Sequence, residues 1–148
     1  MAGSGTAHLR APEDTLLRVE HLLVEFPVGS SGLKVNAVTD ISLDIADGET
    51  VGLVGESGCG KSTTGRAIMQ FPKPTGGRVL FDGTDLTTLS GEQLRRTRTH
   101  MQMIFQDPIS SLNPRRTIRD IVGEPLNIWK RGTGAEREAR IDEVLDTV

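Results

Sequence analysis

The sequence has one cysteine, no tyrosine and one tryptophan among its 148 residues. A single cysteine excludes an internal disulfide and, without neighbouring histidine or cysteine ligands, a structural zinc site. No apolar run approaches the roughly 18 residues of a membrane-spanning helix, so we expect no direct membrane insertion. The formal net charge is −3, which argues against nucleic acid as a partner. Residues 1–14 carry Glu13 and Asp14 and lack an apolar stretch, so we expect no secretory signal and a cytoplasmic location.

A glycine-rich loop is the most informative feature that is present, and it lies in the stretch VGLVGESGCGKST at 51–63. Glycines let successive backbone amides curl inward at the start of a helix whose dipole favours anions, the arrangement that cradles nucleotide phosphates. Lys61 is suited to the β and γ phosphates, Ser62 to Mg²⁺, and Thr63 to the α phosphate. The predicted nucleotide-binding positions in this loop are Gly55, Glu56, Ser57, Gly58, Cys59, Gly60, Lys61, Ser62 and Thr63.

Apolar patterning predicts the elements around the loop. We expect a flexible tail over 1–16, an antiparallel pair of strands over 17–26 and 35–45, and a buried strand over 51–54 that leads into the loop. A helix should follow over 64–70, then a short strand over 78–81 and a buried strand over 101–105.

Three further helices are expected in the second half. Ser90 and Gln93 have the spacing of a capping box, and Arg95, Arg96 and Arg98 would complement the negative end of that helix's own dipole. Thr117 and Asp120 are expected to cap the next helix, which Pro125 should kink or end. From Ala135 a last helix places Ile141, Val144, Leu145 and Val148 on one face, and the chain stops inside that pattern, so we expect a truncated end.

The order of GESGCGKST, MQMIFQDP and SSLNPR resembles the ATP-binding subunits of ABC transporters. The combination IFQDPISSLNPRRTIRDIVGEPL is similar to the oligopeptide and dipeptide importer branch. The resemblance implies an α/β fold: a P-loop NTPase (ABC ATPase) core with an N-terminal antiparallel β subdomain and the start of a helical subdomain, truncated. Residues 17–106 would form the nucleotide-binding core and residues 107–148 the beginning of the helical subdomain.

The resemblance also implies ATP and Mg²⁺ as ligands, with Lys61 and Gln106 as catalytic positions. Gln106 would touch Mg²⁺, with Ser62, and the attacking water. Phe26 would stack on adenine; a place in the core is the alternative reading for this residue. The implied partners are transmembrane permease subunits, met near Ser110–Arg115, and a second ATP-binding subunit, at the inner face of the cell membrane. A solvated charged pair is the alternative for Arg115 and Arg116.

Departures from the family pattern bear on activity. Residues 89–93 read LSGEQ but precede Gln106, so we interpret them as a helix start and not as the LSGGQ signature. The sequence shows no Walker B strand and no switch histidine, so the chain alone is expected to bind ATP with little or no turnover. Two alternatives stay open: a hydrolysis-deficient nucleotide-binding fragment and, disfavoured by residues 106–115, a small P-loop kinase.

Overall fold

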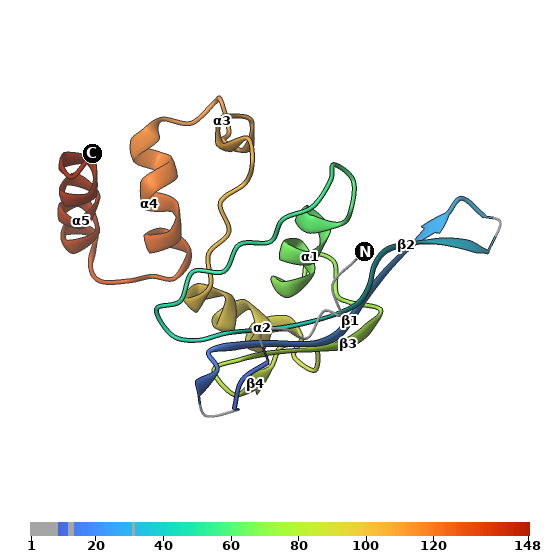
Figure 1. Ribbon diagram of the computed structural model, residues 1–148. Helices are drawn as coiled ribbons and strands as arrows, with labels where there is room; N and C mark the ends of the chain where they lie inside the picture. Colours follow the sequence, from blue (N-terminus) through green and yellow to red (C-terminus); the bar gives the residue numbers. More distant parts are fainter. Residues whose placement is uncertain (1–8, 12–13, 31) are drawn as a thin grey trace. The chain divides into compact units, whose positions relative to one another are not determined.

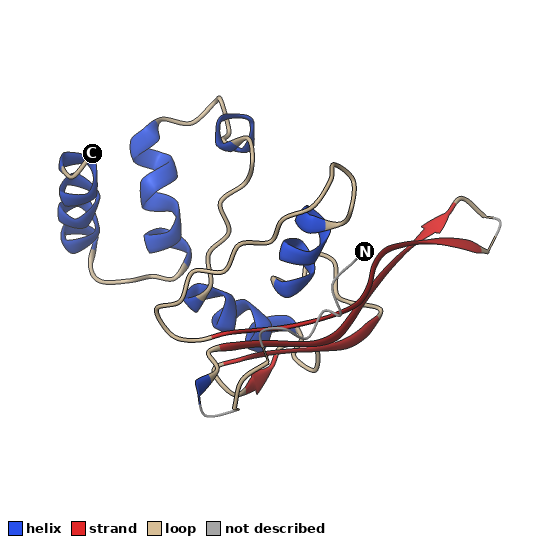
Figure 2. Cartoon of the chain, viewed as in Figure 1, coloured by secondary structure: helices blue, strands red, loops and turns tan. Residues whose placement is uncertain are grey.

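The computed structural model describes residues 9–11, 14–30 and 32–148, and it divides into two compact units, Met1–Gln102 and Met103–Val148. Most of the tail expected over 1–16 lies outside the described residues. Figure 1 shows the course of the chain, and Figure 2 shows its helices and strands.

The first unit is built on a four-stranded antiparallel sheet. Its strands are β1 (Leu17–Val28), β2 (Leu33–Ile45), β3 (Gly76–Phe81) and β4 (Thr84–Asp85), in the order β2-β1-β3-β4. The predicted antiparallel pair and the short strand over 78–81 are thus confirmed. β1 pairs with β3 only as far as Leu23, so the β1–β2 ribbon runs on past the end of β3 (Figure 2).

An irregularity in β1 explains its apolar pattern. Leu17 and Val19 face the core, and after a register shift Leu22 and Val24 face it, which breaks the strict alternation. At the shift His21 has φ 49°, and such a bulge lets a strand turn its next side chains back to the same face. The core consists of Leu17, Val19, Leu22, Val24, Val38, Ala67, Val79 and Leu86.

Two helices and a short 3₁₀ turn complete this unit: α1 (Lys61–Ile68), α2 (Gly91–Thr97) and η2 (Arg98–His100). α1 buries Thr64 and Ala67 against the sheet. The capping box predicted at Ser90 is wrong, because the Ser90 side chain makes no capping hydrogen bond. Ser90 still precedes the helix as its N-cap residue, and its carbonyl accepts from the Leu94 amide at 3.5 Å, so only the side-chain part of the predicted cap is missing.

The second unit contains α3 (Pro108–Ser111), α4 (Ile118–Ile128) and α5 (Gly134–Asp146). The predicted cap of α4 is confirmed, because Thr117 and Asp120 form a capping box. Pro125 does not end α4, which continues to Ile128. Ile141 is buried in α5 as expected, but Val148 is fully exposed beyond the end of that helix.

Two predicted strands are wrong. Residues 51–54 and 101–105 are irregular, and Val54 and Ile104 are 89% and 84% exposed. A strand forms when a neighbouring strand satisfies its backbone amides and carbonyls, and no described strand pairs with either segment. Part of their apolar surface, at Val54 and Ile104, therefore stays exposed, while Met101 packs against the core.

Candidate nucleotide-binding site

The glycine loop opens directly into the N terminus of α1. Gly60 is the residue that caps the helix, with φ 95°, and Gly58 has φ 81°. Residues other than glycine rarely adopt this left-handed backbone, so the sequence needs glycine at both positions. The loop residues 52–59 are exposed and Lys61 is half-buried, so the N terminus of α1 is open to a ligand.

Gly60 also lies against β2. A Cβ atom at Gly60 would lie 2.3 Å from the carbonyl oxygen of Ala37, closer than any side chain can approach. The loop is therefore held to the sheet at its end, while a Cβ at Gly58 would meet nothing within 4 Å. This contact positions the helix start relative to the β1–β2 ribbon.

The Lys61 ammonium folds back over the loop. Its Nζ donates to the carbonyl oxygens of Gly55 and Glu56, at 2.7 and 2.6 Å, and lies 3.6 Å from the Sγ atom of Cys59. These are weak, exchangeable partners for a full positive charge. A phosphate group at the loop would offer the ammonium a stronger, charge-assisted hydrogen bond.

Backbone amides at the helix start are available for an anion. Thr64 donates its amide to the carbonyl of Gly60 at 2.8 Å, as expected one turn into a helix. In the described ranges, the amides of Gly60, Lys61 and Ser62 have no protein acceptor. Unpaired amides at a helix N terminus, with an adjacent lysine, favour a phosphate ligand. Ser62 is exposed beside them and offers an oxygen of the kind that Mg²⁺ prefers.

Phe26 and Gln106 lie outside this loop. Phe26 is on β1 opposite Val35 and is 40% exposed, so the alternative of a core side chain is wrong. Gln106 is exposed just before α3 and belongs to the second unit. Their assigned roles stay predictions.

Arg98 makes a contact that its neighbours in the sequence do not predict. Its Nε and Nη2 atoms donate to the carbonyls of Met69 and Gln70, at 3.1 and 2.9 Å, at the C-terminal end of α1. Its positive charge was expected at the C-terminal end of its own helix, but the guanidinium binds the C-terminal end of α1. No local pattern could reveal this, because Arg98 and Met69 belong to different elements of the chain.

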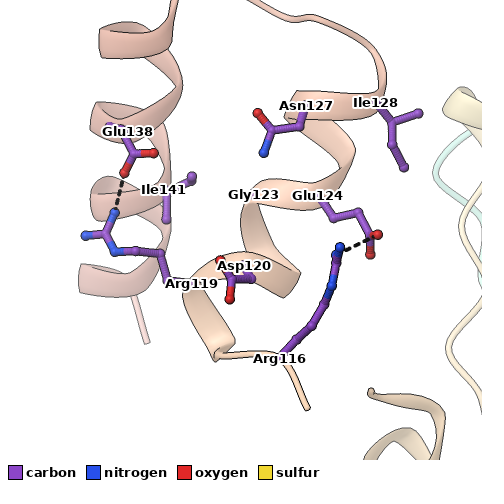
Figure 3. A pocket seen from close by; sticks show the side chains of 9 residues that line it. All are labelled: Arg116, Arg119, Asp120, Gly123, Glu124, Asn127, Ile128, Glu138 and Ile141. Carbon is purple, nitrogen blue, oxygen red and sulfur yellow. Dashed lines mark hydrogen bonds and ion pairs between the residues drawn. The ribbon is translucent and has the colours of Figure 1, made fainter. Parts of the chain in front are cut away.

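A separate pocket of about 600 Å³ lies in the second unit, between α4 and α5 (Figure 3). Gly123 and Ile141 contribute apolar lining, and charged side chains surround them. Arg119 bonds Glu138 at 2.8 Å and also pairs with Asp142. Arg116 bonds Glu124 at 2.7 Å, and both side chains are exposed, so Arg116 belongs to a solvated ion pair. The pocket's arginines are thus already paired within the unit.

Metal centres and membrane-spanning helices were sought in the part of the chain that the structure describes. Among these residues, no group of histidine, cysteine and acidic side chains could hold a metal ion. None of the helices in the described ranges has the length and apolar character to cross a membrane.

A glycine loop that ends in Lys61 and Ser62 at a helix N terminus defines a nucleotide-binding protein of the P-loop class. The model of the ABC transporter family matches residues 38–148, and the chain belongs to that family. Its fold is accordingly the α/β fold of an ABC ATPase, represented by the antiparallel sheet, the phosphate loop with α1 and the first helices of the second unit.

Several curated relatives are named for peptide transport. The chain is 44% identical to the oligopeptide transport ATP-binding protein AppF of Bacillus subtilis, over 93% of this chain and 44% of AppF. It is 50% identical to the oligopeptide transport ATP-binding protein OppF of the same species, over 91% of this chain and 44% of OppF. It is 48% identical to a putative peptide import ATP-binding protein of Brucella ovis, over 92% of this chain and 42% of that protein. The chain thus spans less than half the length of these relatives.

Solved structures agree on the fold. The ATP-binding cassette MJ0796, in a dimeric post-hydrolysis state with ADP and Pi, superposes with a TM-score of 0.73 at 30% identity. The superposition covers 88% of this chain and 56% of that one. The protein cbiO1 of Clostridium perfringens, part of the ABC transporter complex cbiONQ, superposes with a TM-score of 0.68 at 28% identity, over 90% of this chain and 50% of that one.

Proposed function

We propose that this chain is the nucleotide-binding part of the ATPase subunit of a peptide-type ABC importer, whose longer protein couples ATP binding and hydrolysis to transport. The observation that carries the proposal is the open N terminus of α1, where unpaired amides and the Lys61 ammonium meet. The relatives named for oligopeptide and peptide transport support the cargo class.

Each loop residue then has a role toward Mg-ATP. The amides around Gly60 and Lys61 bind the phosphate oxygens, and the Lys61 ammonium moves from the loop carbonyls to the β and γ phosphates. Ser62 holds Mg²⁺, which neutralises phosphate charge when it is bound. Phe26 provides a stacking face for the base, and Gln106 contributes to the magnesium and water positions.

The partners follow from the same proposal. Transmembrane permease subunits would dock on the second unit, near the exposed segment Ser110–Arg115. A second ATP-binding subunit would complete the nucleotide site, as the dimeric form of MJ0796 suggests. The protein would work at the cytoplasmic face of the membrane.

Binding of Mg-ATP by wild type and Lys61→Ala tests the nucleotide role. We expect Lys61→Ala to weaken binding on the order of a hundredfold, about 2.7 kcal/mol. The unfolding midpoint should stay unchanged, because the Lys61 ammonium bonds only exposed groups of the loop. Lys130→Ala removes the same charge from a turn after α4 and should bind as wild type does. Equal affinities for all three proteins would disprove the assignment.

Turnover separates the importer from a chain that only binds nucleotide. ATP hydrolysis is measured for the chain alone, for the chain with permease subunits, and for the longer protein with those subunits. We expect measurable turnover only from the longer protein. The residues that the structure describes include no cluster of acidic side chains that could hold a metal ion. Absence of turnover in all three would favour the binding-only alternative.

A further inference from the structure

The turn that ends α1 is of a kind that usually contains a glycine, but it contains none here. The Gln70 amide donates to Ala67 at 2.9 Å and the Phe71 amide donates to Arg66 at 2.7 Å, the hydrogen-bond pattern of a Schellman motif. The left-handed position of that motif usually holds glycine, but here Gln70 occupies it with φ 62°. The buried Gln70 side chain donates its Nε2 to the Ala67 carbonyl at 3.1 Å, and contacts from outside α1 also hold the chain in this turn.

Arg98 makes those contacts. Its guanidinium donates to the Met69 and Gln70 carbonyls, at 3.1 and 2.9 Å, and its central carbon lies 3.7 Å from the centre of the Phe71 ring. These carbonyls lie at the negative end of the α1 dipole, where a fixed positive charge is favourable. The planar guanidinium satisfies two acceptors and one ring face at once, which a lysine ammonium does not match.

The helix between this end and the phosphate loop is short. α1 has eight residues, about 12 Å of helix, so its two ends move together. Thr64 and Ala67 rest on the sheet in the middle, and Gly60 meets Ala37 at the start. The C-terminal end, at Met69 and Gln70, is the part of α1 that Arg98 contacts.

We propose that Arg98 is a positioning residue of the nucleotide site, which holds the C-terminal end of α1 and so sets the aim of the loop amides at its other end. The inference rests on the proposed function, that the loop binds Mg-ATP. It goes beyond that function because it assigns a role to a side chain outside the loop.

A purely structural role for Arg98 makes a different prediction. If Arg98 only stabilises the fold, its loss lowers the free energy of unfolding, but the molecules that remain folded bind nucleotide normally. If Arg98 positions α1, the folded molecules bind more weakly. Affinity measured well below the unfolding midpoint of every variant therefore separates the two roles.

The test compares Mg-ATP affinity for the full chain as wild type, Arg98→Ala and Arg96→Ala. We expect Arg98→Ala to weaken binding about tenfold, because the amides no longer converge on the phosphates. Arg96→Ala is the matched control: it lies on the neighbouring turn of the chain and loses only an exposed pair with Glu92. Its affinity should equal that of wild type.

Two milder variants cover the case in which Arg98→Ala does not fold. Arg98→Lys keeps the positive charge but loses the planar guanidinium that reaches two carbonyls, and Phe71→Leu removes the ring under the guanidinium. We expect each variant to weaken Mg-ATP binding about threefold. Wild-type affinity in every folded variant overturns the role of Arg98 and leaves the proposed function intact. Absence of binding by wild type itself overturns the proposed function, and the role of Arg98 with it.

Discussion

The guanidinium of Arg18 forms a two-pronged ion pair with the carboxylate of Asp44, across neighbouring strands. Arg18 Nε donates to Asp44 Oδ1 at 2.9 Å and Nη2 donates to Oδ2 at 2.8 Å. The two residues face each other in the β1–β2 register, and the Asp44 side chain is fully buried. The Arg10 amide adds a third hydrogen bond to the carboxylate, at 2.6 Å. A buried charge is tolerated here because its acceptors are satisfied.

Asp44→Asn should destabilise the first unit by about 2 to 4 kcal/mol, because it leaves the Arg18 charge without its partner in a half-buried position. Urea unfolding followed by circular dichroism measures the change. Glu92→Gln is the control, since Glu92 is exposed and pairs only with Arg95 and Arg96 on its own helix. A loss for Asp44→Asn no larger than that of the control would contradict the prediction.

The same pair predicts a loss of stability in acid. Burial by itself raises the pKa of the Asp44 carboxyl, but hydrogen bonds from Arg18 and the Arg10 amide outweigh it, and the pKa lies below its ordinary value of 3.8. A carboxyl whose pKa is lowered by folding stabilises the fold fully above its unfolded pKa, and that contribution is lost as the pH falls through the folded pKa.

The measurement is the unfolding free energy of wild type and Asp44→Asn between pH 7 and pH 2. The difference between the two proteins should be constant above about pH 4 and should shrink below it. A difference that stays constant down to pH 2 would show that Asp44 does not titrate with folding.

Gly60→Ala should both destabilise the chain and abolish Mg-ATP binding. The added Cβ would lie 2.3 Å from the Ala37 carbonyl oxygen, so the helix start must move away from β2. Gly83→Ala is a matched control, because Gly83 also has a positive φ, 71°, but a Cβ there meets nothing within 4 Å. We expect the free energy of unfolding to fall by about 1 to 2 kcal/mol for the control and by more for Gly60→Ala. Thermal unfolding and nucleotide titration of both variants check this.

The exposed segment 51–54 predicts self-association of the isolated chain. Leu53 is 46% exposed and Val54 is 89% exposed, next to each other on an irregular segment. Val54→Lys should reduce association, measured by sedimentation velocity. It should not lower the free energy of unfolding, because the exposed Val54 side chain makes little packing contact that the substitution could remove. Val148→Lys, at a second exposed valine outside this segment, should have no effect. A monodisperse monomer for wild type would contradict the prediction.

Much of the site was predictable because its signals are local. The loop glycines, Lys61 and the start of α1 follow from residues that are neighbours in the chain, and so does the capping box of Thr117 and Asp120. The predicted strands over 51–54 and 101–105 failed for the opposite reason: apolar residues favour a strand, but a strand also needs a partner.

Residue type and spacing were enough to establish that a phosphate loop exists, that β1 and β2 pair, and where α4 and α5 begin. Spacing along the chain could not reveal that Ala37 abuts Gly60, that Asp44 is buried under Arg18, or that Arg98 closes the end of α1. Each of these contacts joins groups far apart in sequence, and folding alone brings them within hydrogen-bonding or van der Waals range.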